Sequence, residues 1–132
     1  MEIHFRVNEK ITAQAVIDIF KSSGINRPVD DVKRIQSMLD NSNLIITAWN
    51  GTELIGIARS LTDFNYCCYL SDLAIKKDHQ KLGIGKTLIE LTQEAIGEQT
   101  MLLLLSSSPA MEYYPKIGFE KVENGFIIKR KA

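Results

Sequence analysis

The stretch that decides the fold runs from Tyr66 to Leu105 and reads YCCYLSDLAIKKDHQKLGIGKTLIELTQEAIGEQTMLLLL. Its first ten residues, Tyr66–Ile75, predict a strand, and the polar, glycine-punctuated segment that follows predicts a loop. Lys86–Ile96 then places apolar residues at helical spacing before Gly97, which is a typical helix stop. Met101–Leu105 is an apolar run too short for a helix, and we expect a strand buried on both faces. Together these segments predict a βαβ unit.

The residues before this unit predict one strand, two amphipathic helices and a hairpin. Ile3–Val7 forms the opening strand, and Thr12 precedes an apolar helical stripe that ends at Gly24. A second helix follows Pro28, with Asp30 and Asp31 in its first turn and an apolar face from residue 32 to 39. Strands over 43–49 and 53–61 then flank Asn50-Gly51, a dipeptide that favours a tight antiparallel turn.

The residues after the unit predict a short helix and a closing hairpin. The helix begins at Ser108-Pro109 and ends at Gly118, and Asn124-Gly125 joins strands over Phe119–Val122 and Phe126–Lys129. We see no repeat or linker, so we expect residues 1–132 to form a single domain. Its predicted class is α/β (α+β), with a mixed central sheet of about six to seven strands and about four helices on its two faces.

Composition narrows the class of protein. The 16 basic residues balance the 16 acidic residues, so no overall field draws the chain to nucleic acid or to a membrane surface. No apolar run approaches the roughly 20 residues of a membrane span, and the N-terminus lacks the pattern of a secretory signal. We therefore expect a cytoplasmic protein. Cys67 and Cys68 are adjacent and lack metal-ligand spacing, so we predict reduced thiols and no metal site.

The loop Gln80–Thr87 is the most informative segment because its two glycines and the helix start can present several backbone N–H groups to a phosphate. Three phosphate-binding motifs compete for it. Gly85-Lys86-Thr87 matches the end of a nucleotide-hydrolase loop, but Gln80 stands where that loop begins with glycine. A dinucleotide fingerprint needs a third small residue where this chain has Leu88.

The third motif, Q-x-x-G-x-G, resembles the acetyl-CoA pyrophosphate loop of the GNAT superfamily of N-acetyltransferases. The preceding segment Tyr69–Ile75 resembles that family's fourth strand, and Ala110–Phe119 resembles its A-x-x-F-Y-x-K-x-G-F segment. The resemblance implies a GNAT-like fold with a V-shaped splay between strands 4 and 5. It also implies an enzyme that uses acetyl-CoA as cosubstrate to acetylate a primary amine of a small molecule or a peptide.

The resemblance also implies site residues. In the family the pantetheine arm pairs with exposed backbone of the fourth strand, which here corresponds to Leu73 and Ile75. Serine hydroxyls after the fifth strand would replace a common asparagine. The cofactor-binding residues implied in this way are Leu73, Ala74, Ile75, Gln80, Lys81, Leu82, Gly83, Ile84, Gly85, Lys86, Thr87 and Ser107. Tyr114 matches the tyrosine that protonates the departing thiolate, and its phenol ordinarily ionises near pH 10. Tyr113 is expected to pack in the core.

The sequence indicates the general base and the pocket for the acceptor amine less clearly than it indicates the cofactor loop. Asp72 on the predicted fourth strand is our candidate base, with His79 a weaker one and water an alternative. Four charged residues either line the acceptor pocket or lie on the surface: Arg6, Asp18, Arg27 and Arg59. Two other functions stay open at this stage, a CoA-binding or regulatory module without turnover and a nucleotide-phosphate enzyme. The terminal hairpin also offers an edge for a homodimer.

Overall fold

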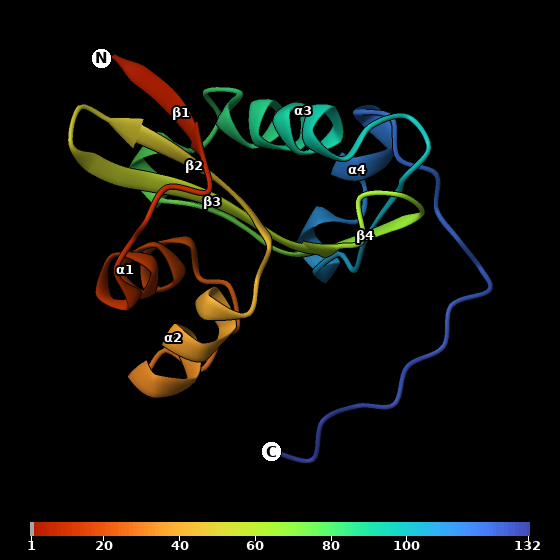
Figure 1. Ribbon diagram of the computed structural model, residues 1–132, viewed down its shortest axis with the longest axis horizontal. Helices are drawn as coiled ribbons and strands as arrows, with labels where there is room; N and C mark the ends of the chain where they lie inside the picture. The colour runs from red at the N-terminus through yellow and green to blue at the C-terminus, as the bar shows by residue number, and fades with distance from the viewer. Residues whose placement is uncertain (1) are drawn as a thin grey trace.

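A twisted sheet of five strands forms the centre of the computed structural model, which describes residues 2–132 (Figure 1). Met1, counted in the predicted domain, lies outside the described residues. The strands follow chain order, β1 (Ile3–Val7), β2 (Leu44–Asn50), β3 (Glu53–Thr62), β4 (Cys67–Ile75) and β5 (Met101–Leu104). The first three pairings are antiparallel, whereas β4 and β5 are parallel. The α/β class and the mixed sheet are thus confirmed.

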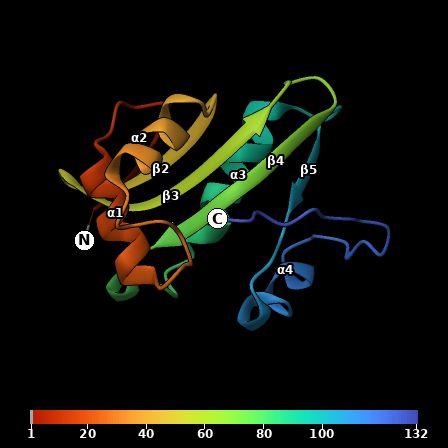
Figure 2. The same cartoon turned by 90° about the horizontal axis from the view of Figure 1, so that it is seen from below.

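Helices cover both faces of the sheet, as predicted (Figures 1 and 2). On one face lie α1 (Ala13–Ser23) and α2 (Val32–Asp40), and on the other lie α3 (Ile84–Ile96) and the short α4 (Tyr113–Lys116). Two 3-10 turns, η1 (Lys77–His79) and η2 (Ser108–Ala110), precede α3 and α4. The sheet separates two apolar cores, one packed with α1 and α2 and the other with α3.

Capping residues set the helix ends. The Thr12 hydroxyl accepts a hydrogen bond from the Ala15 N–H at 3.1 Å, and Gly24 ends α1 in a left-handed conformation. The Asp31 carboxylate accepts from the Arg34 N–H at 3.0 Å, so Asp31 caps α2 and does not stand inside its first turn as predicted. An N-cap residue accepts from the third residue after it, and this fixes the start of α2 at Val32.

Two irregularities of β4 shape the molecule. Arg59 of β3 faces Asp72 while Ser60 faces Leu70, so Ser71 has no opposite residue and forms a β-bulge. On the other edge, the pairing of β4 with β5 stops at Leu70, and β4 continues to Ile75 without a neighbour on that side. This opening is the predicted splay between strands 4 and 5.

The C-terminal part departs from the sequence prediction. The segments predicted as a closing hairpin, 119–122 and 126–129, form no strand in the described chain, so the sheet has five strands where we expected six to seven. An isolated two-stranded ribbon is at best marginally stable and needs a neighbouring strand. The predicted burial of the fifth strand is also wrong, because Met101 and Leu105 are 54% and 65% exposed. No helix of the described residues is long and apolar enough to cross a membrane.

Candidate functional site

The glycine loop leads into the N-terminus of α3, as the sequence predicts. Gly83 has a φ of 77° and is the N-cap, and Lys81 is also left-handed at 69°. The first main-chain bond of the helix joins Thr87 N–H to Gly83 C=O, and Gln80 N–H is bonded to Lys77 C=O. Between them, the N–H groups of residues 81–86 have no hydrogen-bond partner among residues 2–132. These donors, together with the positive end of a 13-residue helix, fit a diphosphate.

The open edge of β4 ends beside this loop. Lys76 N–H bonds to the Ile55 C=O of β3 at 2.8 Å. Backbone groups alternate sides along a strand, so the N–H and C=O of Leu73 and Ile75 point toward the open edge. The Gln80 side chain donates to the Ile75 C=O at 2.9 Å, which ties the loop to the end of the strand. The Leu73 N–H and C=O and the Ile75 N–H stay available to a ligand on this edge.

Short α4 brings an aromatic pair to the same region. A methyl group on Gly85 would lie 3.1 Å from Ile75 Cδ1 and 3.9 Å from the Tyr113 hydroxyl, so β4, the loop and α4 meet there. Tyr113 is 40% exposed, and the prediction that it packs in the core is therefore wrong. Tyr114 packs on the α3-side core and against Phe119, with ring centroids 5.5 Å apart. Burial, and then the neighbouring Tyr113, raise the pKa of Tyr114.

Asp72 is fully buried and forms two ion pairs. Arg27 Nε and Arg59 Nε each lie 2.5 Å from one of its carboxylate oxygens. Arg27, from the α1–α2 loop, also donates to the Ser71 C=O at 2.6 Å, and Arg59 donates to the Ser42 and Ser71 hydroxyls. Both carboxylate oxygens are occupied by guanidinium groups that always carry a proton. This arrangement favours a structural role, holding the α1–α2 loop against the bulge of β4.

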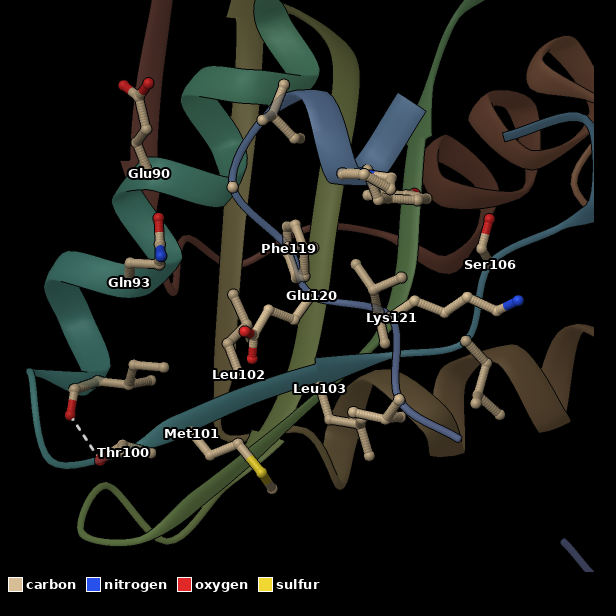
Figure 3. A pocket seen from close by; sticks show the side chains of 18 of the residues that line it. Glu90, Gln93, Thr100, Met101, Leu102, Leu103, Ser106, Phe119, Glu120 and Lys121 are labelled. Atoms are coloured by element: carbon tan, nitrogen blue, oxygen red, sulfur yellow. Dashed lines mark hydrogen bonds between the residues drawn. The ribbon is translucent and has the colours of Figure 1, made fainter. Parts of the chain in front are cut away.

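The remaining predicted residues lie around the splay or away from it. Ser107 is exposed at the start of η2, and its C=O accepts from the Ser106 hydroxyl and from the Ala110 N–H. A cavity of about 1350 Å³ lies elsewhere, lined by α3, β5 and residues 117–122 (Figure 3). Of the predicted site residues only Tyr114 lines that cavity, and no residue of the glycine loop does. The free N–H groups of the glycine loop, and not this cavity, are therefore the candidate place for a diphosphate.

Sequence reasoning missed the Arg27–Asp72–Arg59 cluster. Arg59 directly follows the apolar run 54–58 of β3 and is 6% exposed, and a buried arginine requires an acidic partner. An arginine at the end of this apolar run was the one signal of the cluster in the sequence. The partner itself, 13 residues further along, and Arg27, 45 residues before it, become evident only once the fold is known.

The architecture is that of an α/β protein in which a helix start with unpartnered N–H groups lies beside a splayed parallel strand pair. The chain matches the model of the acetyltransferase (GNAT) domain over residues 5–129, and it belongs to this family of acetyl-transferring enzymes. It is 28% identical to the uncharacterized N-acetyltransferase ycf52 of Pyropia yezoensis over 131 residues, covering 94% of this chain and 74% of that protein. The family expected from the sequence is confirmed.

Solved structures agree on the fold. A GNAT-family acetyltransferase from Streptococcus pneumoniae superposes with a TM-score of 0.78 at 20% identity, covering 99% of this chain and all of that one. An aminoglycoside N-acetyltransferase in complex with CoA superposes with a TM-score of 0.74 at 16% identity, covering 99% and 96%. Members of the GNAT family use acetyl-CoA, and the second structure contains CoA.

Proposed function

We propose that this chain transfers the acetyl group of acetyl-CoA to a primary amine of a small molecule or a peptide by direct attack of the amine. The observation that carries the proposal is the run of unpartnered main-chain N–H groups over residues 81–86, which begin α3 beside the open edge of β4. Acetyl-CoA would supply the thioester and the diphosphate. From the sequence, we also propose a cytoplasmic location and no nucleic-acid or membrane partner.

In this proposal the loop and β4 hold the cosubstrate. The N–H groups of residues 81–86 bind the diphosphate, and Lys81 and Lys86 add positive charge. Leu73 and Ile75 offer two N–H groups and one C=O to the amides of the pantetheine arm, as a strand would. Ala74 supports them from the core on the α1 side. Ser107 follows β5 across the splay and offers its hydroxyl.

The chemical step forms a carbon–nitrogen bond and breaks a carbon–sulfur bond. The neutral amine attacks the thioester carbonyl and loses a proton to water, and the thiolate that leaves takes a proton from the Tyr114 hydroxyl. The raised pKa of Tyr114 keeps that proton in place at neutral pH. We do not retain Asp72 as the base. Its two ion pairs occupy both oxygens, and its role in this proposal is to hold the α1–α2 loop.

Ligand-dependent thermal unfolding and a turnover assay test this function. CoA or acetyl-CoA at about 100 times its dissociation constant should add about 2.7 kcal/mol, or about 10 °C in the melting temperature of a chain of this size. ATP should add nothing. CoA release with a library of primary amines then separates an enzyme from a CoA-binding module, because a module would be stabilised and yet release no CoA with any amine.

A further inference from the structure

Arg27 borders the splay at the end where β4 and β5 separate. The pairing of the two strands stops at Leu70, and Arg27 binds the next two residues of β4, with Nη2 2.6 Å from the Ser71 C=O and Nε 2.5 Å from the Asp72 carboxylate. Arg27 belongs to the loop between α1 and α2, which cover the face of the sheet opposite α3 (Figure 1). Its guanidinium group therefore lies on the α1 side of the splay.

The proposed function puts the reacting thioester at the same end of the splay. The diphosphate would lie on the loop after β4, and the pantetheine arm would run back along the open edge, past Ile75 and then Leu73. The thioester, at the far end of that arm, would then lie near Leu70. Tyr114, the proposed proton donor, packs on the α3-side core, so the α1 side is the one left for the acceptor amine.

The Arg27–Asp72–Arg59 cluster carries one positive charge that no acidic residue balances in the described chain. Both guanidinium groups pair with Asp72 and with no other carboxylate of residues 2–132. Asp30 and Asp31, in the same loop as Arg27, form no ion pair with it. Arg59 is 6% exposed, so a ligand can meet the excess charge only at Arg27, whose side chain is 25% exposed. A partly buried cation in excess favours an anionic ligand.

Arg27 also keeps hydrogen-bond donors for such a ligand. Of the five N–H donors of a guanidinium group, three are bonded, to the Asp72 carboxylate, the Ser71 C=O and the Asn26 C=O. The other two, one on Nη1 and one on Nη2, have no partner within residues 2–132. A carboxylate has two oxygens that can accept both bonds.

We propose that the acceptor is a small amino acid, whose carboxylate binds Arg27 while its amine faces the thioester. The inference rests on the proposed function and adds the class of the acceptor. Because Ser71 and Asp72 directly follow the last paired residue of β4, the carboxylate and the amine lie only a few bonds apart, as in an α-, β- or γ-amino acid. The N-terminal amine of a peptide carries an amide in place of this carboxylate. The carboxylate takes no part in the bond changes of the acetyl transfer.

Rates of CoA release from paired amines test this acceptor class. Each amino acid of an α-, β- and γ-series is compared with its own amide at equal concentrations of the neutral amine, so the two differ only in the carboxylate. The acids that react should show a kcat/KM roughly tenfold or more above that of their amides, because a charge-assisted pair with Arg27 forms on binding. The difference should lie in KM and not in kcat.

Arg27→Gln assigns the preference to this residue. The variant should raise KM for the acids roughly tenfold and leave KM for the amides and the affinity for CoA unchanged. Arg59 still pairs with Asp72 in this variant, so the fold should persist, and the melting temperature checks this. Arg27→Lys keeps the charge and should retain part of the preference. Arg34→Gln is the matched control and should keep all of it, since Arg34 is an exposed arginine of α2 without an ion pair in the described chain.

Three results would overturn this acceptor class. The first is a set of amides that react as well as their acids, and the second is an absence of CoA release with every amino acid of the series. The third is a preference for acids that survives Arg27→Gln, which would place the carboxylate elsewhere. In all three cases the stabilisation of the chain by CoA still reports on the cosubstrate site, so the proposed function fails separately, by the absence of that stabilisation.

Discussion

Gly83 and Gly51 share a left-handed backbone, with φ of 77° and 60°, and neither has an atom near the place of a Cβ. Aspartate at either position should lower the free energy of unfolding by about 1–2 kcal/mol through backbone strain. Only Gly83→Asp should also abolish CoA binding, because it adds a negative charge among the N–H groups of residues 81–86. Calorimetric titration with CoA checks this. Equal affinity in the two variants would move the diphosphate away from the loop.

Tyr114 and Tyr113 are adjacent and in edge contact, with ring centroids 5.3 Å apart, yet we expect different effects from their hydroxyls. Tyr114→Phe should lower turnover by roughly a hundredfold and leave CoA affinity unchanged, because a general acid acts in the transition state. Tyr113→Phe should weaken CoA binding, since its hydroxyl lies beside Gly85. If Tyr113→Phe lowers turnover and Tyr114→Phe does not, the proton donor is Tyr113.

The pH dependence of turnover is a second test of Tyr114 as the proton donor. A general acid is active while protonated, and burial raises the pKa of Tyr114 above its ordinary value near 10. The contribution of Tyr114 should therefore persist through neutral and mildly alkaline pH and be lost as the pH rises through that raised pKa. In Tyr114→Phe this alkaline decline should be absent.

Substitution of Asp72 distinguishes a structural role of this residue from a catalytic one. Asp72→Asn would leave two guanidinium groups without their buried counter-charge, and we expect it to lower the free energy of unfolding by about 3–5 kcal/mol. Asp78→Asn, on an exposed residue of η1, is the control and should change it by less than about 0.5 kcal/mol. Urea denaturation measures both. An Asp72→Asn protein of normal stability that had lost turnover would restore the general-base interpretation.

The turn between β3 and β4 depends on a carboxylate. Asp63 accepts backbone N–H bonds from Asn65, Tyr66 and Cys67, and these lower its pKa to about 2 from 3.8. A carboxylate whose pKa is lower in the folded state than in the unfolded state stabilises the fold at any pH above its unfolded pKa. This stabilisation is lost as the pH falls from about 4 through about 2. Asp63→Asn should therefore flatten the fall of melting temperature between pH 4 and pH 2. Asp30→Asn should leave that slope unchanged.

Elements defined by local patterns were predictable from the sequence. The stripe and caps of α1 and the turn at Gly51 arise from residues only a few positions apart, and so does the glycine loop, because helix spacing and positive φ are local properties. The burial of β5 and the pairing of residues 119–129 were not predictable, since both depend on what lies beside the sheet edge. The same limit applies to Asp72, whose partner Arg27 is 45 residues away.

The sheet as a whole leaves backbone groups unpaired on two neighbouring strands of the described chain. The side of β4 that faces the splay carries the free backbone groups of Leu73 and Ile75, and the side of β5 that faces away carries those of Leu102 and Leu104. In the proposed function the first edge binds the cosubstrate. The two edges do not overlap, so the second serves as an internal control for protection of the first by CoA.

Hydrogen exchange with peptide-level resolution makes this separation testable. Saturating CoA should slow exchange at Leu73, Ile75 and residues 81–86, because their N–H groups gain acceptors, and should leave Leu102 and Leu104 unchanged. Exchange at Leu102 and Leu104 reports any general stabilisation, because their N–H groups lie on the other edge. CoA that protects the outer edge of β5 and not the glycine loop would show that the cosubstrate edge is assigned wrongly.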